Sequence, residues 1–283
     1  MRPATSARGR TATTSTDTAA HLLAALRDGE LEVIGRLIGS SNNAMVVRIW
    51  PAVTENTTAG DAPTSAPALH PGFGKALEPD DLLGVWKPTA GERPLFDFPL
   101  GTLTRREVAS YLVSEATGWA IVPPTLLRDG PYGEGMLQQW IDVDPEADVI
   151  AMVNDDDPRL RRIAVLDAVL NNTDRKAGHL LPVPGGHLHA VDHGVTFSEE
   201  PKLRTVLWAW EGEPFDPEEV AALAGVATAL GSRSAPGPLA ITLGELLAAP
   251  EIEATRARIT ALLDAGVFPS PSPDWPAIPW PPV

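Results

Sequence analysis

The chain has 283 residues, 43% of them hydrophobic and 21% charged, which is enough to bury one or two cores in a soluble globular protein. It contains no cysteine, which excludes a disulfide framework, a thiol nucleophile and a cysteine-ligated zinc. The formal net charge of −15 argues against nucleic acid as a partner, because a phosphate backbone attracts clustered lysine and arginine.

Apolar runs in the chain are short. The longest, such as IAVLDAVL, fall far below the roughly 18 residues that cross a bilayer, and the N-terminus carries no secretory apolar segment. We therefore expect a cytoplasmic protein without integral membrane association. The most acidic stretch, 141–157, is predicted to be a solvated loop in preference to a dedicated metal site, since charge runs usually face water.

The first third of the chain predicts a tail, a helix and three strands. Residues 1–17 are small and polar, and we expect them to be disordered. A short helix follows at 18–28, and 31–50 is typical of a strand, a Gly/Ser/Asn turn and a second strand. Residues 51–80, rich in Pro, Ala and Thr, predict an unstructured insertion, after which DLLGVWKP predicts a strand that ends near Lys87.

Thr104 opens a predicted helix with apolar residues at helical spacing, and Gly118 closes it. Strands are predicted at 120–127 and 136–142, joined by a Gly-rich turn at about 130–135.

The second half is predicted to be mostly helical, interrupted by a hairpin-like pair in GGHLHAVDHG. The Pro-rich end cannot form regular structure, and we expect its two tryptophans to pack against the body. The predicted helices are 159–170, 217–230, 241–248 and 251–265, and the tryptophans are Trp275 and Trp280.

Together these elements predict an α+β protein of two lobes, a small lobe of sheet plus one helix and a mostly helical lobe. The predicted divisions are a disordered tail at 1–17, an N-lobe at 18–140 with a flexible insertion at about 51–80, a C-lobe at 141–268 and a Pro/Trp-rich tail at 269–283.

Four short segments, VWKP, RREVA, NNTDRKAGH and AVDHG, occur in this order along the chain. Their order and rough separations resemble the lysine strand, helix glutamate, catalytic loop and metal-binding turn of the phosphatidylinositol 3-/4-kinase-like superfamily. The stretch from about 30 to 265 is similar to a family of uncharacterised actinobacterial proteins with this catalytic core. The resemblance implies a protein-kinase-like fold and transfer of a phosphoryl group from ATP to a lipid, a protein hydroxyl or a small molecule.

Five residues receive roles from this resemblance, and the chemistry of a triphosphate supports them, because its negative charge must be neutralised. Lys87 is expected to bind the phosphates and Glu107 to hold its ammonium. Asp174 is expected to accept the acceptor's proton. His179 and Asp192 are expected to bind Mg²⁺ or Mn²⁺, with the imidazole favouring the softer ions.

Two further segments are predicted to contact the nucleotide. Backbone N–H groups of a turn can lie over phosphates, as in a Gly-rich loop. The segment MLQQWID is expected to lie under the adenine, with backbone groups making hydrogen bonds and apolar neighbours enclosing the ring. The residues are Gly39, Ser40, Ser41, Asn42 and Asn43 in the turn, and Gln138, Gln139 and Trp140 in the linker.

Each of these residues also has a purely structural interpretation. Glu107 could complete a capping box with Thr104, and Lys87 could be an exposed residue at a strand end. Asp174 could belong to a turn that ends a helix, together with Asn171 and Asn172. Asp192, His193 and Gly194 could form a type I turn.

Two other functions remain open. His179 stands where related kinases have asparagine, which motivates the alternative of a pseudokinase that binds nucleotide or a partner, although the acidic ligands present favour catalysis and Asn172 could substitute. The run with His187, His189, Asp192 and His193 is similar to the H-x-H-x-D-H motif of metal-dependent hydrolases. Its spacing is one residue too long, and no histidine follows it.

The segment after AVDHG contributes one more pair of residues. Lys202 and Arg204 stand out against acidic surroundings and could neutralise an anionic acceptor, or form a solvated basic pair.

Overall fold

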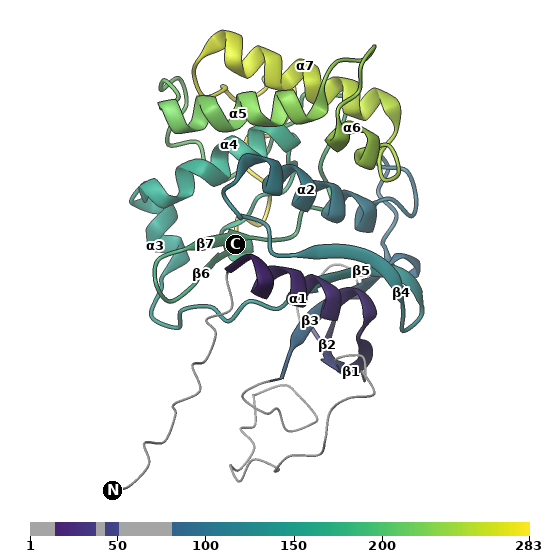
Figure 1. Ribbon diagram of the computed structural model, residues 1–283. Helices are drawn as coiled ribbons and strands as arrows, with labels where there is room; N and C mark the ends of the chain where they lie inside the picture. Colours follow the sequence, from purple (N-terminus) through teal and green to yellow (C-terminus); the bar gives the residue numbers. More distant parts are fainter. Residues whose placement is uncertain (1–14, 38–42, 51–80) are drawn as a thin grey trace, which may run out of the picture.

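The computed structural model describes residues 15–37, 43–50 and 81–283 (Figure 1). Most of the predicted tail, the residues Gly39, Ser40, Ser41 and Asn42 of the phosphate turn, and the predicted insertion at 51–80 lie outside the described residues. Within them, no helix is both long and apolar enough to cross a membrane.

A five-stranded antiparallel sheet is formed by the first half of the chain, with strand order β1-β2-β3-β5-β4. Its strands are β1 (Glu30–Arg36), β2 (Met45–Trp50), β3 (Leu83–Pro88), β4 (Thr125–Gly130) and β5 (Gly133–Gln139). The strand predicted at 120–127 begins later, because the backbone N–H groups of Ile121 and Val122 donate to the Ser114 hydroxyl instead of to a neighbouring strand.

Two helices cover opposite faces of the sheet. Side chains alternate between the faces of a strand, so the neighbours Trp86 and Lys87 of β3 point in opposite directions. Trp86 packs in a cluster with Leu26 of α1 (Ser15–Asp28), whereas Lys87 contacts α2 (Leu103–Thr117). The predicted helices at 18–28 and after Thr104 are confirmed, with α1 beginning at Ser15.

Glycine allows β3 and β5 to approach closely beside Lys87. A Cβ atom on Gly135 would lie 2.5 Å from the Lys87 carbonyl oxygen and 2.8 Å from the Trp86 ring. The Trp86 ring fills the space that this glycine leaves, and its Nε1 donates to the Pro131 carbonyl at 2.8 Å. The pairing of β3 with β5 therefore fixes where Lys87 leaves the sheet.

The second half is helical, as predicted, with a two-stranded sheet of β6 and β7. The acidic segment is not all loop, because Asp148 accepts hydrogen bonds from the backbone N–H groups of Ile150 and Ala151 and so caps a short helix there. The elements are α3 (Val149–Asn154), α4 (Arg161–Leu170), β6 (Leu180–Pro182), β7 (Leu188–Ala190), α5 (Pro217–Leu230), α6 (Pro238–Leu243) and α7 (Ala249–Ala265).

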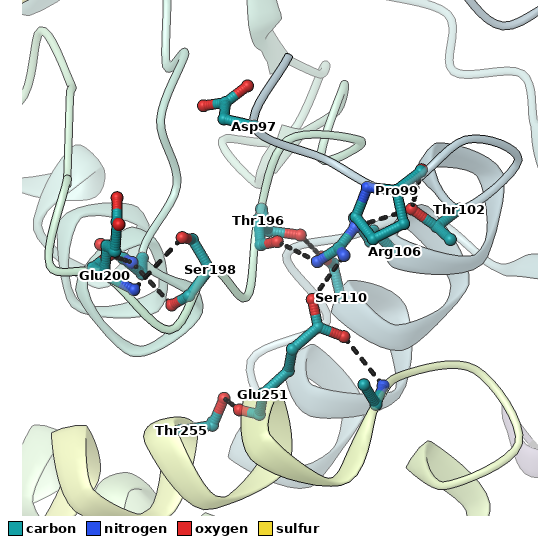
Figure 2. A network of polar contacts seen from close by, with 12 residues as sticks. Asp97, Pro99, Thr102, Arg106, Ser110, Thr196, Ser198, Glu200, Glu251 and Thr255 are labelled. Carbon is teal, nitrogen blue, oxygen red and sulfur yellow. Dashed lines mark hydrogen bonds and ion pairs between the residues drawn. The ribbon is translucent and has the colours of Figure 1, made fainter. Parts of the chain in front are cut away.

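Helix α2 lies between the sheet and the helical part of the chain (Figure 1). Its apolar residues Ala109 and Val113 belong to the large core cluster formed by the helices of the second half. Arg106, which is fully buried, pairs with Glu251 of α7 and donates to the Thr196 carbonyl at 2.7 Å, as Figure 2 shows. This helix is therefore anchored in the helical part.

Candidate active site

An ion-pair triad joins the three main parts of the fold. The Lys87 ammonium lies 2.6 Å from Oε1 of Glu107 and 2.8 Å from Oδ1 of Asp192. The other oxygen of Glu107 accepts the backbone N–H of His193 at 2.9 Å. Residues 20 and 105 positions away from Lys87 thus meet it at one point, as the sequence predicted.

Burial and neighbouring charges have opposite effects on the pKa of Lys87. Burial alone would lower the pKa of Lys87, but the carboxylates of Asp192 and Glu107 outweigh that effect and raise it above the ordinary value. The Lys87 ammonium in turn lowers the pKa of Asp192. Lysine and aspartate are therefore both charged across the physiological range, and the exposed-lysine interpretation of Lys87 is wrong.

The capping-box interpretation of Glu107 is also wrong. The N-terminus of α2 is capped from outside the helix by Glu92, whose Oε1 accepts both the backbone N–H and the hydroxyl of Thr104 at 2.8 Å. Glu107 is consequently left to bind Lys87, with its side chain only 2% exposed.

The loop after α4 combines the turn that was expected with a polar site. Asn171 ends α4 in the left-handed conformation with φ of 52°, and Asn172 accepts the backbone N–H of Asp174 at 3.0 Å. The Asp174 side chain itself lies at a pocket, 3.1 Å from the Lys176 ammonium. Burial raises the pKa of Asp174, and Lys176 opposes that rise. Asn171 and Asn172 therefore shape the loop that presents Asp174.

A buried network holds this loop against the turn that carries Asp192. Arg175, fully buried, donates from Nε and Nη2 to the two oxygens of Asp167, each at 2.9 Å. The same guanidinium donates to the Val191 carbonyl at 2.8 Å and lies 2.6 Å from Nε2 of His193. Burial lowers the pKa of His193 well below its ordinary value, so its ring is neutral and Nε2 accepts from Arg175.

His179 and Asp192 face each other, with 3.4 Å between Nε2 and Oδ2. Burial lowers the pKa of His179 to about 4, so the ring is neutral near pH 7, the form that binds metal. Asp192 adopts φ of 62°, unusual outside glycine, which orients its carboxylate toward both Lys87 and His179. In the described parts of the chain, no group of three His, Asp or Glu side chains converges. The two side chains fit a metal whose other ligands are phosphate oxygens and water.

The predicted linker to the adenine is partly engaged in the sheet. The backbone N–H of Gln139 donates to Pro124 and that of Trp140 to Leu83, at 2.9 and 3.0 Å. The Gln138 side chain is buried and donates to the Thr125 hydroxyl. These two N–H groups are therefore occupied, and β5, which carries Gln138 and Gln139, lies between β3 and β4 in the sheet.

A small apolar cluster lies on the same sheet face as Lys87. The Trp140 ring, which was expected only to supply backbone groups, packs with Ile34, Val46 and Leu83 in a small cluster of its own. Leu83 and Lys87 are an even number of residues apart on β3 and so share a face. Asn43, the one described residue of the predicted phosphate turn, lines a small recess next to Lys87.

The histidines of the hydrolase alternative have other partners. Nε2 of His187 and Nδ1 of His189 lie 3.0 and 3.1 Å from the carbonyl oxygens of Ala120 and Ile121, to which they donate. His193 is buried against Arg175. These rings do not converge with Asp192 on a metal position.

Sequence reasoning missed several residues that shape this region. Asp167 carried a signal, since it is a lone acid in the apolar run IAVLDAVL. Lys202 was expected to contact an acceptor or solvent, but it is 2% exposed and pairs with Asp97 at 2.8 Å. Trp275 packs against Lys202, as expected of the tail, whereas Trp280 is 87% exposed, contrary to prediction.

Comparison with known proteins gives a match along nearly the whole chain, a match over part of it and a likeness to solved structures. No family model matches. The chain is 40% identical over 293 residues to Protein Rv2133c of Mycobacterium tuberculosis (strain ATCC 25618 / H37Rv), covering 91% of this chain and 94% of that protein. It is 30% identical over 138 residues to phosphatidylinositol 4-kinase gamma 4 of Oryza sativa subsp. japonica, covering 41% of this chain but 24% of the rice protein.

Among solved structures, the Helicobacter pylori proinflammatory kinase CtkA aligns with a TM-score of 0.44 and 10% identity, over 86% of this chain and 94% of CtkA. The partial match to the rice protein agrees with the kinase-like core expected from the motifs. The nearly full-length match shows the family, which includes an actinobacterial member: the chain belongs to the family of the mycobacterial protein Rv2133c.

Proposed function

We propose that the chain is an ATP-dependent phosphotransferase with a phosphatidylinositol 3-/4-kinase-like core. The observation that carries the proposal is the convergence of Lys87, Glu107 and Asp192 from a strand, a helix and a loop. A carboxylate with a raised pKa, Asp174, lies nearby at a pocket that Asp192 also lines. Phosphoryl transfer requires this combination of phosphate charge neutralisation and a residue that orients the acceptor.

The residues divide the work as follows. Lys87 binds the phosphates of ATP, Glu107 keeps its ammonium in place, and the half-buried Trp140 at the margin of the apolar cluster contacts the base. Asp192 and His179 would hold Mg²⁺ or Mn²⁺, which neutralises phosphate charge when bound. Asp174 accepts the proton of the acceptor hydroxyl while the hydroxyl oxygen bonds to the γ-phosphorus and the bond from that phosphorus to the departing ADP oxygen breaks.

Asp174→Asn is expected to lower phosphoryl transfer by about 10²- to 10⁴-fold while ATP affinity is retained, because the amide cannot accept the proton. The assay uses γ-labelled ATP with Mg²⁺ or Mn²⁺ in turn and follows label into the protein, added lipid and released phosphate. Since burial raises the pKa of Asp174, wild-type transfer should fall with decreasing pH earlier than it would for an ordinary aspartate. A variant as active as the wild type, with the same acid limb, would remove Asp174 from this role.

Asp192→Asn is expected to weaken metal-dependent ATP binding by at least about tenfold, since it removes the charged metal ligand. Calorimetric titration with ATP in Mg²⁺, Mn²⁺ or chelator measures the effect. Glu218→Gln, on an exposed residue of α5, is the matched control and should bind like the wild type. Equal affinity of Asp192→Asn and wild type in both metals would refute the metal assignment.

A pseudokinase is the second candidate, favoured by the imidazole of His179 where an amide oxygen is usual and by the lack of a third metal-ligating side chain beside it in the described residues. The same two measurements separate the candidates. ATP binding without transfer to any acceptor class, in either metal, would favour the pseudokinase.

A further inference from the structure

A pocket of about 450 Å³ opens beside Asp174 and Asp192. Its walls come from the segment 93–98 after β3, from the loop after α4, from Arg204 and from Trp275 near the C-terminus. A volume of several hundred Å³ is the size range of small-molecule sites. The pocket therefore lies where an acceptor would have to approach Asp174.

Arg204 is one of three cationic residues that line this pocket, with Arg93 and Lys176. Its backbone is fixed to the loop that carries Asp174, since its N–H donates to the Asn172 carbonyl at 2.9 Å and its carbonyl accepts from Arg175 at 3.1 Å. Its Nε is buried and has no hydrogen-bond partner, and no carboxylate in the described parts of the chain forms an ion pair with it. A buried guanidinium N–H without a partner is costly unless a ligand satisfies it.

The acids around the pocket already have cationic partners. Asp192 pairs with Lys87, Asp174 with Lys176 and Asp97 with Lys202. Within the described residues Arg204 forms no direct ion pair, although its charge opposes the rise that burial causes in the pKa of the nearby Asp174. Arginine in such a position binds phosphate or carboxylate through parallel N–H groups.

Aromatic side chains form the other wall, and Lys202 holds them. Its ammonium lies 4.8 Å from the Phe98 ring and 5.3 Å from the Trp275 ring, while it pairs with Asp97. The C-terminal segment is fixed behind Trp275, since the Ala277 carbonyl accepts from the Thr205 N–H and from Trp208 Nε1 at 3.0 and 2.9 Å. Trp275 is therefore a fixed flat surface, not a mobile tail residue.

We propose that this pocket is the acceptor site and that it takes a small soluble molecule with an anionic group for Arg204 and a flat apolar part for Trp275. The assignment rests on the proposed phosphotransfer function and specifies its acceptor class. The acceptor hydroxyl lies toward Asp174. The C-terminal segment is then part of the substrate site, because it supplies the stacking wall.

Phenyl phosphate is a probe that carries both features, and inorganic phosphate and phenol carry one each. Calorimetric titration should show phenyl phosphate binding at least about tenfold more tightly than either. Arg204→Gln should weaken phenyl phosphate by about 10- to 100-fold, and Arg204→Lys by less. Trp275→Leu should weaken phenyl phosphate while inorganic phosphate binds as before. Arg233→Gln, on an exposed arginine at another cavity, is the matched control and should match wild type.

The proposal would be overturned if folded Arg204→Gln bound phenyl phosphate as tightly as the wild type. It would also be overturned if ATP displaced phenyl phosphate from the wild type, because the probe would then lie in the nucleotide site. If the protein bound phosphatidylcholine–phosphatidylglycerol vesicles more tightly than phenyl phosphate, and if that binding depended on Arg204, the ligand of the pocket would be a lipid and the small-molecule proposal would be wrong. ATP binding by the same preparations separates the two proposals. ATP binding without phenyl phosphate binding refutes this pocket alone, whereas Arg204-dependent phenyl phosphate binding without ATP binding supports the pocket's ligand class and refutes the kinase.

Discussion

Lys87→Met should reduce phosphoryl transfer by about 10²-fold or more and destabilise the fold at the same time. The loss of transfer follows from removing the ammonium that neutralises phosphate charge. The loss of stability follows because the Glu107 carboxylate, 2% exposed, would keep only the His193 N–H as a hydrogen-bond partner within the described residues. Removing one partner of a buried ion pair costs about 3–5 kcal/mol. Urea unfolding and the labelled-ATP assay measure the two effects separately.

The double variant Lys87→Met/Glu107→Gln distinguishes structure from chemistry. It removes the charge of the buried Glu107, while the Asp192 carboxylate is 42% exposed and can be solvated. Most of the unfolding free energy should therefore return, while transfer should stay as low as in the single variant. Transfer that recovers together with stability would show that Lys87 acts only by supporting the fold, and would count against phosphate binding by this lysine.

Arg175→Met should destabilise the fold by about 3–5 kcal/mol, because it leaves the Asp167 carboxylate buried with, among the described residues, only the Asn172 amide as side-chain partner. Urea unfolding monitored by tryptophan fluorescence gives the free energy. Arg162→Met is the matched control, since its pair with Glu218 is exposed at both ends, 51% and 72%, and such pairs contribute about 1 kcal/mol or less.

A double variant again tests the cause. Arg175→Met/Asp167→Leu removes both buried charges, and much of the lost stability should return. Both variants should bind ATP with metal more weakly than the wild type, because Arg175 also contacts Val191 and His193 on either side of Asp192. A double variant that binds ATP normally would restrict Arg175 to a role in folding.

The order of the motifs predicted which residues would lie close together, whereas their roles stay predictions. Lys87, Glu107 and Asp192 meet although no local pattern links positions 105 residues apart, and the family resemblance supplied that link. Local patterns alone were misleading. Thr104 and Glu107 fit a capping box, but Glu92, twelve residues before Thr104, caps the helix, and only the folded chain shows that competition.

Burial of charge was the other property that local reasoning could not predict. Lys202 looked like a solvent-facing base in acidic surroundings, yet Asp97 and two aromatic rings from distant segments enclose it. Element limits shifted for a similar reason, since the Ser114 hydroxyl takes two N–H groups that a longer β4 would have used. In each case a side chain far along the chain changed what the local pattern favoured.

Helix α2 has a mechanical consequence for the cleft. Kinases that are switched by moving the helix with their glutamate need that helix to shift readily. Here Arg106 ties α2 to α7 and to the Thr196 carbonyl, so a shift of the helix would strip a buried guanidinium of its partners (Figure 2). Glu107 is therefore held with the helical part of the chain, so a shift of the sheet relative to α2 would have to break the pair between Lys87 and Glu107.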